Sequence, residues 1–180
     1  MVSYELLVQQ IRELAKIDRT YLPVLANTAA LLYETLDDIN WAGFYLLNHG
    51  SLMLGPFQGR PACVRIPVGK GVCGTAVKNN SIQCVANVHE FPGHITCDSA
   101  SNSEIVIPIH KDDHVIGVLD IDSPLFSRFG ASDEKGLQDL VTVLEEETDF
   151  AGVQTQLSHK IIRAYLYGRK RTHYQTCQTS

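Results

Sequence analysis

The amino-acid sequence predicts an α+β fold, in which helices flank a mainly antiparallel sheet of about six strands. The chain opens with two segments, 3–17 and 22–37, whose apolar residues recur at helical spacing. Short β-branched and aromatic segments follow, and the turns at 48–50 and 111–113 join neighbouring segments as hairpins. Because a hairpin reverses the chain, strands joined in this way are antiparallel.

The remaining elements follow from local patterns along the chain. We expect strands, in chain order, at 41–47, 51–55, 63–68, 82–86, 105–109 and 114–121. A short helix at 72–78 follows the glycines at 69 and 71, and a last helix begins with Ser132 as its N-cap and ends near Glu147. Residues 87–103 form a long loop, and loops beyond ~12–15 residues are usually functional or disordered. This loop holds one cysteine and two histidines, which favours function.

Composition limits the class of protein. The chain has 180 residues, of which 44% are apolar and 19% are charged, as in a soluble globular domain. No apolar run approaches the ~18 residues that a membrane span needs, and the first residues predict an amphipathic helix, not a secretion signal. A net charge of −5 argues against a nucleic-acid partner for the main domain. We therefore expect a cytoplasmic protein with no membrane or nucleic-acid partner.

Charge divides the chain into two parts. Residues 149–180 carry a net charge of +4, against −9 for residues 1–148. We therefore expect an acidic domain at 1–148 and a basic C-terminal extension at 149–180. The extension has some helical spacing of apolar residues, and three roles stay open for it: packing on the domain, contact with a partner, or binding to an acidic group.

Three of the five cysteines are candidates for thiol chemistry. Cys63, Cys73 and Cys97 lack the C-x2-C spacing of zinc knuckles and thioredoxin-like sites. A nucleophilic thiol needs exposure and a lowered pKa. Cys97 lies in the long loop three residues after His94, and Cys73 lies in the first turn of the short helix, where the helix dipole would favour a thiolate. The alternative is that each cysteine is a small buried residue.

A metal site is not expected in the long loop. The order His89, His94 and Cys97 matches no familiar zinc pattern, and no second pair of ligands stands out in the sequence.

Carboxylates and aromatic residues form a second candidate set. Asp120 and Asp122 lie two residues apart on a predicted strand and so share one face, and Glu104 opens the preceding hairpin strand. Like charges so close together favour either ammonium binding or a carboxyl with a raised pKa, although a solvent-exposed strand end would also fit. Trp41 and Tyr45 also share a strand face, as core residues or as the wall of a ligand pocket.

Five segments together resemble the free methionine-(R)-sulfoxide reductases, which are built on a GAF domain. They are Gly-Pro-Phe-Gln-Gly (55–59), Gly-Lys-Gly-Val-Cys-Gly-Thr-Ala (69–76), Phe-Pro-Gly-His-Ile-Thr-Cys-Asp (91–98), Ser-Glu-Ile-Val-Ile-Pro-Ile (103–109) and Gly-Val-Leu-Asp-Ile-Asp-Ser-Pro (117–124). The resemblance covers roughly residues 25–147 and includes the spacing of the three cysteines. It implies that residues 1–148 form a GAF-like catalytic domain, which reduces free L-methionine (R)-S-oxide to methionine.

The resemblance also implies roles for the cysteines. Cys97 matches the catalytic cysteine, and Cys63 and Cys73 match the resolving positions, with Cys63 the more probable first partner. Attack by Cys97 would leave a sulfenic acid, a second cysteine would convert it to a disulfide, and thioredoxin would reduce that disulfide. The family also implies a possible homodimer and no cofactor. Cys84, expected to pack within the sheet, and Cys177, in the extension, have no implied role.

The same resemblance assigns the pocket. Glu104, Asp120 and Asp122 match the acidic residues that hold and polarise the substrate, and Trp41 and Tyr45 match its aromatic wall. Two other functions remain open on the residues alone. The domain could be a non-catalytic GAF sensor that binds a small ligand, or a thiol switch whose disulfide is its output.

Overall fold

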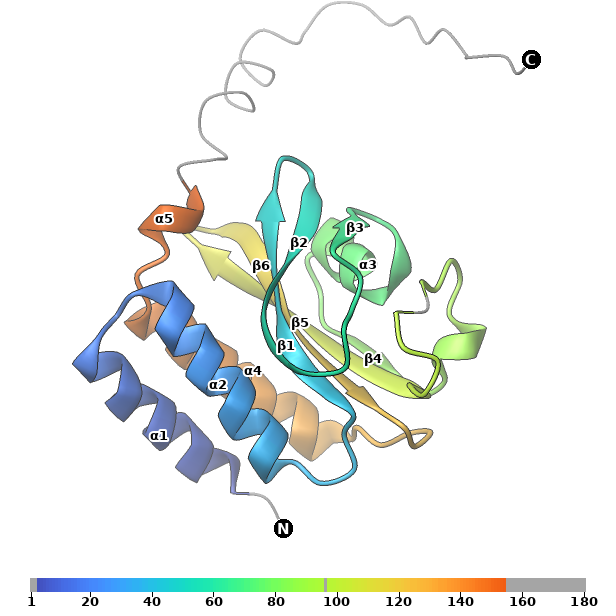
Figure 1. The fold of residues 1–180 in the computed structure, drawn as a ribbon, viewed down its shortest axis with the longest axis horizontal. Helices are drawn as coiled ribbons and strands as arrows, with labels where there is room; N and C mark the ends of the chain where they lie inside the picture. Colours follow the sequence, from blue (N-terminus) through green and yellow to red (C-terminus); the bar gives the residue numbers. More distant parts are fainter. Residues whose placement is uncertain (1–2, 96, 155–180) are drawn as a thin grey trace, which may run out of the picture.

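The computed structural model describes residues 3–95 and 97–154 and contains one sheet with helices on both faces (Figure 1). The elements, in chain order, are α1 (Tyr4–Ile17), α2 (Tyr21–Thr35), β1 (Trp41–Asn48), β2 (Ser51–Gly59), β3 (Arg65–Pro67), α3 (Gly71–Asn79), β4 (Gln83–Val85), η1 (Val88–Glu90), β5 (Ser103–Lys111), β6 (His114–Ser123), α4 (Ala131–Glu147) and α5 (Ala151–Gln154). The six strands follow the order β3-β2-β1-β6-β5-β4, and each neighbouring pair is antiparallel. The predicted α+β class and antiparallel sheet are confirmed.

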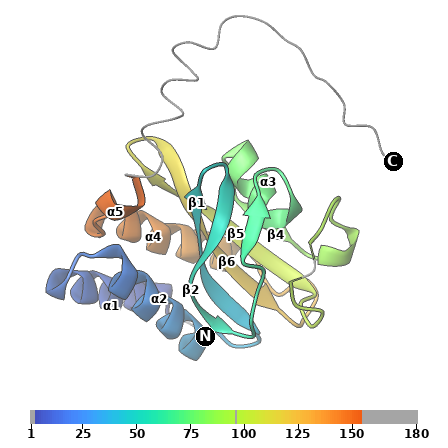
Figure 2. The same cartoon turned by 45° about the horizontal axis from the view of Figure 1, so that its top comes forward.

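The larger core lies between the sheet and the helices α1, α2 and α4, which gather on one face (Figures 1 and 2). Alternate residues of β1, such as Ala42 and Phe44, point into this core because side chains of a strand alternate between faces. Helix α1 packs on α4 and α2, and Leu7 and Ile11 form its buried stripe. This core fixes the central strands β1, β5 and β6.

A smaller core covers the opposite face of the sheet. There the other residues of β1, Trp41 and Tyr45, pack with Val106, Val118 and residues of α3. Helix α3 contacts β5 and β6 from this side. Strands β1, β5 and β6 contribute side chains to both cores. The larger core therefore fixes the backbone of the strands whose opposite face carries the smaller core.

Several local expectations differ from the structure, and three of them affect how strands pair or helices begin. Strand β2 extends to Gly59, beyond the expected end at residue 55, since its whole length pairs with β1. Strand β3 is shorter than expected at Arg65–Pro67. Ser132 does not cap α4: the helix begins at Ala131 after Gly130, whose N–H donates to the Asp133 carboxylate at 2.9 Å. An acidic residue at the third helical position therefore provides the cap.

The described part of the C-terminal extension packs on the domain. Phe150 is fully buried in the larger core, and the Asp149 N–H donates to the Arg19 carbonyl at 2.6 Å. The boundary at residue 148 stays a prediction, and the extension from residue 155 on, with Cys177, lies outside the described residues. Within the described residues, no helix is both long enough and apolar enough to cross a membrane.

Candidate active site

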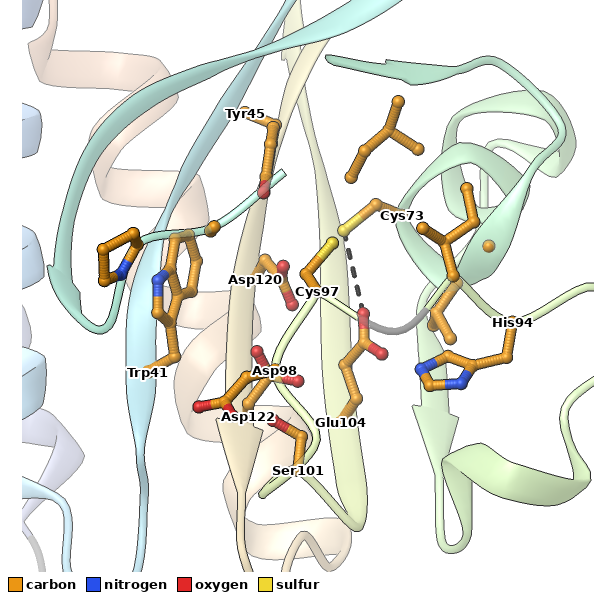
Figure 3. Close-up of a pocket in the computed structure, with 16 residues that line it drawn as sticks. Trp41, Tyr45, Cys73, His94, Cys97, Asp98, Ser101, Glu104, Asp120 and Asp122 are labelled. Atoms are coloured by element: carbon orange, nitrogen blue, oxygen red, sulfur yellow. Dashed lines mark hydrogen bonds between the residues drawn. The ribbon is translucent and has the colours of Figure 1, made fainter. Parts of the chain in front are cut away.

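A pocket opens on the smaller-core face, between the middle of the sheet, α3, the segment 60–63 and the long loop (Figure 3). The strand register brings its acidic residues together: Glu104 of β5 pairs with Asp122 of β6, and Gly43 of β1 pairs with Asp120. Gly43 has no side chain, and Phe57 and the ring of Trp41 occupy the space that a Cβ at this position would take. The remaining cavity is about 40 Å³, a space for a few water molecules.

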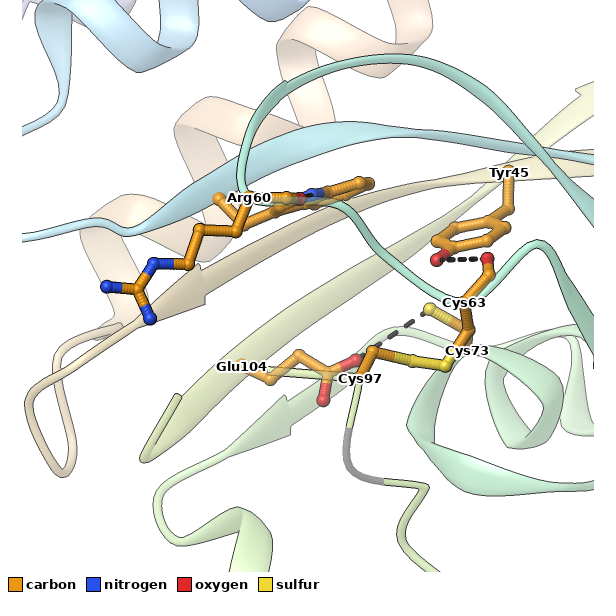
Figure 4. The surroundings of a disulfide bond; sticks show 7 residues. Tyr45, Arg60, Cys63, Cys73, Cys97 and Glu104 are labelled. Atoms are coloured by element: carbon orange, nitrogen blue, oxygen red, sulfur yellow. Dashed lines mark hydrogen bonds between the residues drawn. A yellow bond between two sulfur atoms is a disulfide. The ribbon is translucent and has the colours of Figure 1, made fainter. Parts of the chain in front are cut away.

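The structure brings together every residue that the sequence proposes for the site. Seven of them line the pocket: Trp41, Tyr45, Cys73, Cys97, Glu104, Asp120 and Asp122. The eighth, Cys63, reaches the pocket through a disulfide with Cys97 (Figure 4). The Cα atoms of these two cysteines are 5.4 Å apart, although 34 residues separate them in sequence.

The carboxyls of Glu104 and Asp120 are buried and that of Asp122 is half-buried, and all three hold their protons more tightly than in water. Burial raises the pKa of Asp120 to about 6. Burial, with the neighbouring Asp120 charge, raises the pKa of both Glu104 and Asp122 well above the usual range. One oxygen of Asp120, Oδ1, is buried and has no hydrogen-bond partner among the described residues. The cluster can therefore bind a cationic group and can also supply a proton.

Cys73 is a free, fully buried thiol beside this cluster. Its Sγ donates to Glu104 Oε1 at 3.7 Å. Burial and the nearby carboxyls of Asp120 and Glu104 raise the pKa of the Cys73 thiol well above its usual value. The expectation that the helix dipole favours a Cys73 thiolate is therefore wrong, because the loss of solvation and two acidic neighbours outweigh the dipole.

The aromatic residues form one side of the pocket. Trp41 stacks on Tyr45 with ring centroids 5.8 Å apart, and on Phe57 at 5.3 Å. Both polar groups of the pair hold the segment 60–63: Trp41 Nε1 donates to the Arg60 carbonyl at 3.1 Å and the Tyr45 hydroxyl donates to the Cys63 carbonyl at 3.0 Å. The two residues thus contact both the pocket and the cysteine segment.

The described residues contain one compact set of groups that suits a cation. The Sγ of Cys73 and carboxylate oxygens of Glu104 and Asp120 lie within 4.8 Å of one another. These residues are not the candidate metal ligands His89, His94 and Cys97 of the long loop.

Comparison with known proteins identifies the family. The family model for the GAF domain matches residues 3–147. A free methionine-R-sulfoxide reductase of Escherichia coli is 62% identical over 129 residues, which cover 72% of this chain and 78% of the relative. The chain belongs to the GAF-domain family of free methionine-R-sulfoxide reductases.

Solved structures of the family agree with this assignment. The reduced form of the fRMsr of Staphylococcus aureus has a TM-score of 0.80 and 52% identity, with 83% of this chain and 97% of that chain covered. The free methionine-R-sulfoxide reductase from Neisseria meningitidis in complex with its substrate has a TM-score of 0.78 and 40% identity, with 84% and 90% covered. The GAF expectation from the sequence is confirmed.

The pocket of this free methionine-R-sulfoxide reductase family member also contains residues that the sequence analysis missed. Asp98 and Ser101 line it, and the Asn40 side-chain amide donates to both, at 3.2 and 3.0 Å. His94 lines it too, and burial lowers the pKa of that imidazole. The position of Asp98 directly after Cys97 is the one sequence signal that could have found it. The sequence around Asn40 contains no pattern that predicts its hydrogen bonds to Asp98 and Ser101.

Cys84 occupies a different environment from the one expected. It lies on the edge strand β4 and is exposed, with a weak hydrogen bond from its thiol to the Phe129 carbonyl at 3.6 Å. An edge strand has a neighbour on one side only, so this side chain is not enclosed by the sheet.

Proposed function

We propose that this protein reduces free L-methionine (R)-S-oxide to L-methionine by thiol chemistry. The observation that carries the proposal is the Cys63–Cys97 disulfide beside a pocket that contains the buried carboxyls of Glu104 and Asp120 and the half-buried carboxyl of Asp122. A sulfoxide offers an electrophilic sulfur to a thiolate and a basic oxygen to an acid. The E. coli and N. meningitidis relatives, named for this activity, support the same reaction here.

The first step transfers oxygen. The Cys97 thiolate attacks the sulfoxide sulfur while a carboxyl protonates the sulfoxide oxygen. The protonated oxygen then passes to the Cys97 sulfur: the sulfur–oxygen bond of the substrate and the transient sulfur–sulfur bond break, methionine leaves, and Cys97 becomes a sulfenic acid. The raised pKa of Glu104 or Asp122 keeps a proton available near neutral pH, where an ordinary carboxyl would have lost it.

The second step closes the disulfide. Cys63 attacks the sulfenic sulfur of Cys97, water leaves, and an external dithiol reduces the bridge. We propose thioredoxin as that dithiol and Cys63 as the first resolving cysteine, with Cys73 as the alternative. Burial raises the pKa of the Cys73 thiol, which disfavours the thiolate that would attack the sulfenic sulfur.

The acidic cluster also explains a preference for the free amino acid. Glu104, Asp120 and Asp122 can hold the α-ammonium of free methionine sulfoxide, a group that a residue within a peptide lacks. Trp41 and Tyr45 would contact the apolar part of the substrate. No cofactor is needed for this sequence of steps, and we propose that it takes place in the cytoplasm.

The test measures methionine formation from four substrates: both sulfoxide epimers, each free and within a peptide, under excess dithiothreitol. We expect turnover of the free R epimer alone. Equal turnover of the peptide would contradict the role of the ammonium group. No turnover of any of the four would favour the non-catalytic GAF sensor or the thiol switch.

A further inference from the structure

The segment that carries the proposed resolving cysteine has no regular structure of its own. Residues 60–63 connect β2 to β3 and form neither helix nor strand. Two side chains of β1 hold the ends of this segment. Trp41 Nε1 donates to the carbonyl of Arg60. The Tyr45 hydroxyl donates to the carbonyl of Cys63 (Figure 4). The position of Cys63 therefore depends on hydrogen bonds from β1.

These two donors are themselves fixed by packing. Trp41 is 2% exposed and Tyr45 is 1% exposed, and their rings stack on each other. The chain also passes very close to the indole at Gly59, where a Cβ would lie 2.7 Å from Trp41 and where φ is +124°. Because the anchors are buried and stacked, they hold the segment from a rigid part of the sheet.

The same end of β1 also holds the Cys97 segment. Asn40, the residue before Trp41, donates to Asp98 and Ser101, which follow Cys97 in the loop. Two consecutive residues therefore hold the two cysteine segments: Asn40 holds the segment after Cys97, and Trp41 holds the segment before Cys63. Arg60 and Asp98 add an ion pair of 3.8 Å between those segments.

We infer that Tyr45 and Trp41 are positioning residues for the disulfide-forming step, in addition to lining the substrate pocket. They hold the 60–63 backbone so that the Cys63 thiol meets the Cys97 sulfenic acid. The inference rests on the proposed function, because it assigns the step that follows oxygen transfer.

The chemistry of this step depends on proximity. The sulfur–sulfur bond forms as the sulfur–oxygen bond of Cys97 breaks, and the Cys63 proton leaves with the hydroxyl group as water. Cys63 is oxidised and the Cys97 sulfur is reduced. Holding the two sulfur atoms together makes the step effectively unimolecular. A misplaced Cys63 would leave the sulfenic acid longer in solution, where further oxidation to sulfinic acid competes.

The test uses the full chain and the variant Tyr45→Phe, which keeps the ring and removes the hydroxyl. Reduced protein receives one equivalent of free methionine-(R)-sulfoxide, and samples are quenched with dimedone, which traps sulfenic acids. Mass spectrometry then gives the trapped Cys97 and the Cys63–Cys97 disulfide at each time. We expect the rate constant for disulfide formation to fall about fivefold, the factor that one net hydrogen bond provides. Trp41→Phe should also slow this step.

The matched control is Tyr4→Phe. Its hydroxyl donates to Asp133 at 2.6 Å, so this variant also loses one tyrosine hydrogen bond, but in the helical layer on the other face of the sheet. We expect wild-type disulfide formation from Tyr4→Phe. Wild-type disulfide formation by Tyr45→Phe would overturn the inference, as would an equal slowing in the Tyr4 control.

A second arm separates this inference from the proposed function. One equivalent of hydrogen peroxide converts Cys97 to the same sulfenic acid without any sulfoxide. If Tyr45→Phe again slows disulfide formation while the wild type releases no methionine from the sulfoxide, positioning stands and the proposed reductase activity fails. If methionine forms normally and disulfide formation is unchanged in both arms, the positioning role fails alone.

Discussion

At the scale of single residues, burial in the fold weakens the acidity of the pocket carboxyls. Strands β5 and β6 place the carboxyls of Glu104, Asp120 and Asp122 away from solvent. Burial is the largest cause of the raised pKa of each carboxyl. Buried like charges destabilise a fold unless a proton or a cation neutralises them. The cluster therefore lowers the stability of the ligand-free protein at neutral pH, and a bound cation would offset this loss.

This cost predicts a pH dependence that Asp120→Asn should reduce. The pKa of Asp120 is about 6 in the folded protein, above its ordinary value, so the folded state binds the proton more tightly than the unfolded state. The free energy of unfolding should then fall as the pH rises through this range. Between about pH 4 and about pH 7, we expect the wild type to lose on the order of 2 kcal/mol relative to Asp120→Asn.

Urea unfolding of both proteins at several pH values measures that difference. The comparison cancels His94, whose lowered pKa makes stability rise with pH over part of the same range. Asp139→Asn, on the exposed surface of α4, is the control and should leave the pH dependence unchanged. Parallel curves for the wild type and Asp120→Asn would contradict a charge cost at this position.

At the scale of elements, β1 has two functions because its side chains alternate. Ala42 and Phe44 enter the larger core, while Trp41 and Tyr45 face the pocket. Between them Gly43 lies opposite Asp120, and the pairing of β1 with β2 shifts register just after it. A side chain at Gly43 would lie 2.4 Å from Phe57 Cβ and 2.7 Å from the Trp41 ring.

Gly43→Ala should therefore disturb the pocket and the sheet together. We expect a loss of about 1–3 kcal/mol in the free energy of unfolding, as for other overpacked sites, and a shift in fluorescence from Trp41. Trp41 is the one tryptophan of the chain, so the emission reports this position directly. Gly130→Ala is the control, since its Cβ would meet no atom closer than 3.9 Å. Unchanged emission and stability in Gly43→Ala would contradict the tight fit described here.

Much of the site could be predicted from sequence, because strand alternation and hairpin order determine which faces meet. Asp120, Asp122 and Glu104 come together for this reason. The environment of Cys73 could not be predicted, since its burial depends on how α3 packs over distant strands. The hydrogen bonds of Trp41 and Tyr45 with the segment 60–63 could not be predicted either. Their acceptors are backbone carbonyls, which every residue has, so the sequence carries no signal for them.

At the scale of the whole molecule, the outer helices expose apolar side chains. Ile17 is 84% exposed, Leu22 is 55% exposed and Leu6 is 54% exposed, all on α1 and at the start of α2. Exposed apolar groups that gather on one surface favour association. We propose that this surface forms the homodimer that the family resemblance implies.

The dimer prediction can be checked by light scattering after size exclusion. We expect the wild type to have twice the chain mass of 19.9 kDa, and the double variant Leu6→Gln, Ile17→Gln to have the mass of one chain. Leu125→Gln removes an exposed leucine elsewhere and should remain dimeric. A wild-type protein with the mass of one chain at micromolar concentration would contradict the proposal.

The proposed reaction depends on the thiol of Cys97, and the substitution of that cysteine tests it. Methionine released from free methionine-(R)-sulfoxide is measured for Cys97→Ser and for Cys84→Ser, both under excess dithiothreitol. We predict no release above the uncatalysed rate from Cys97→Ser and wild-type release from Cys84→Ser, whose thiol lies outside the pocket. Wild-type release by Cys97→Ser would exclude Cys97 as the nucleophile, because a serine hydroxyl cannot take its place.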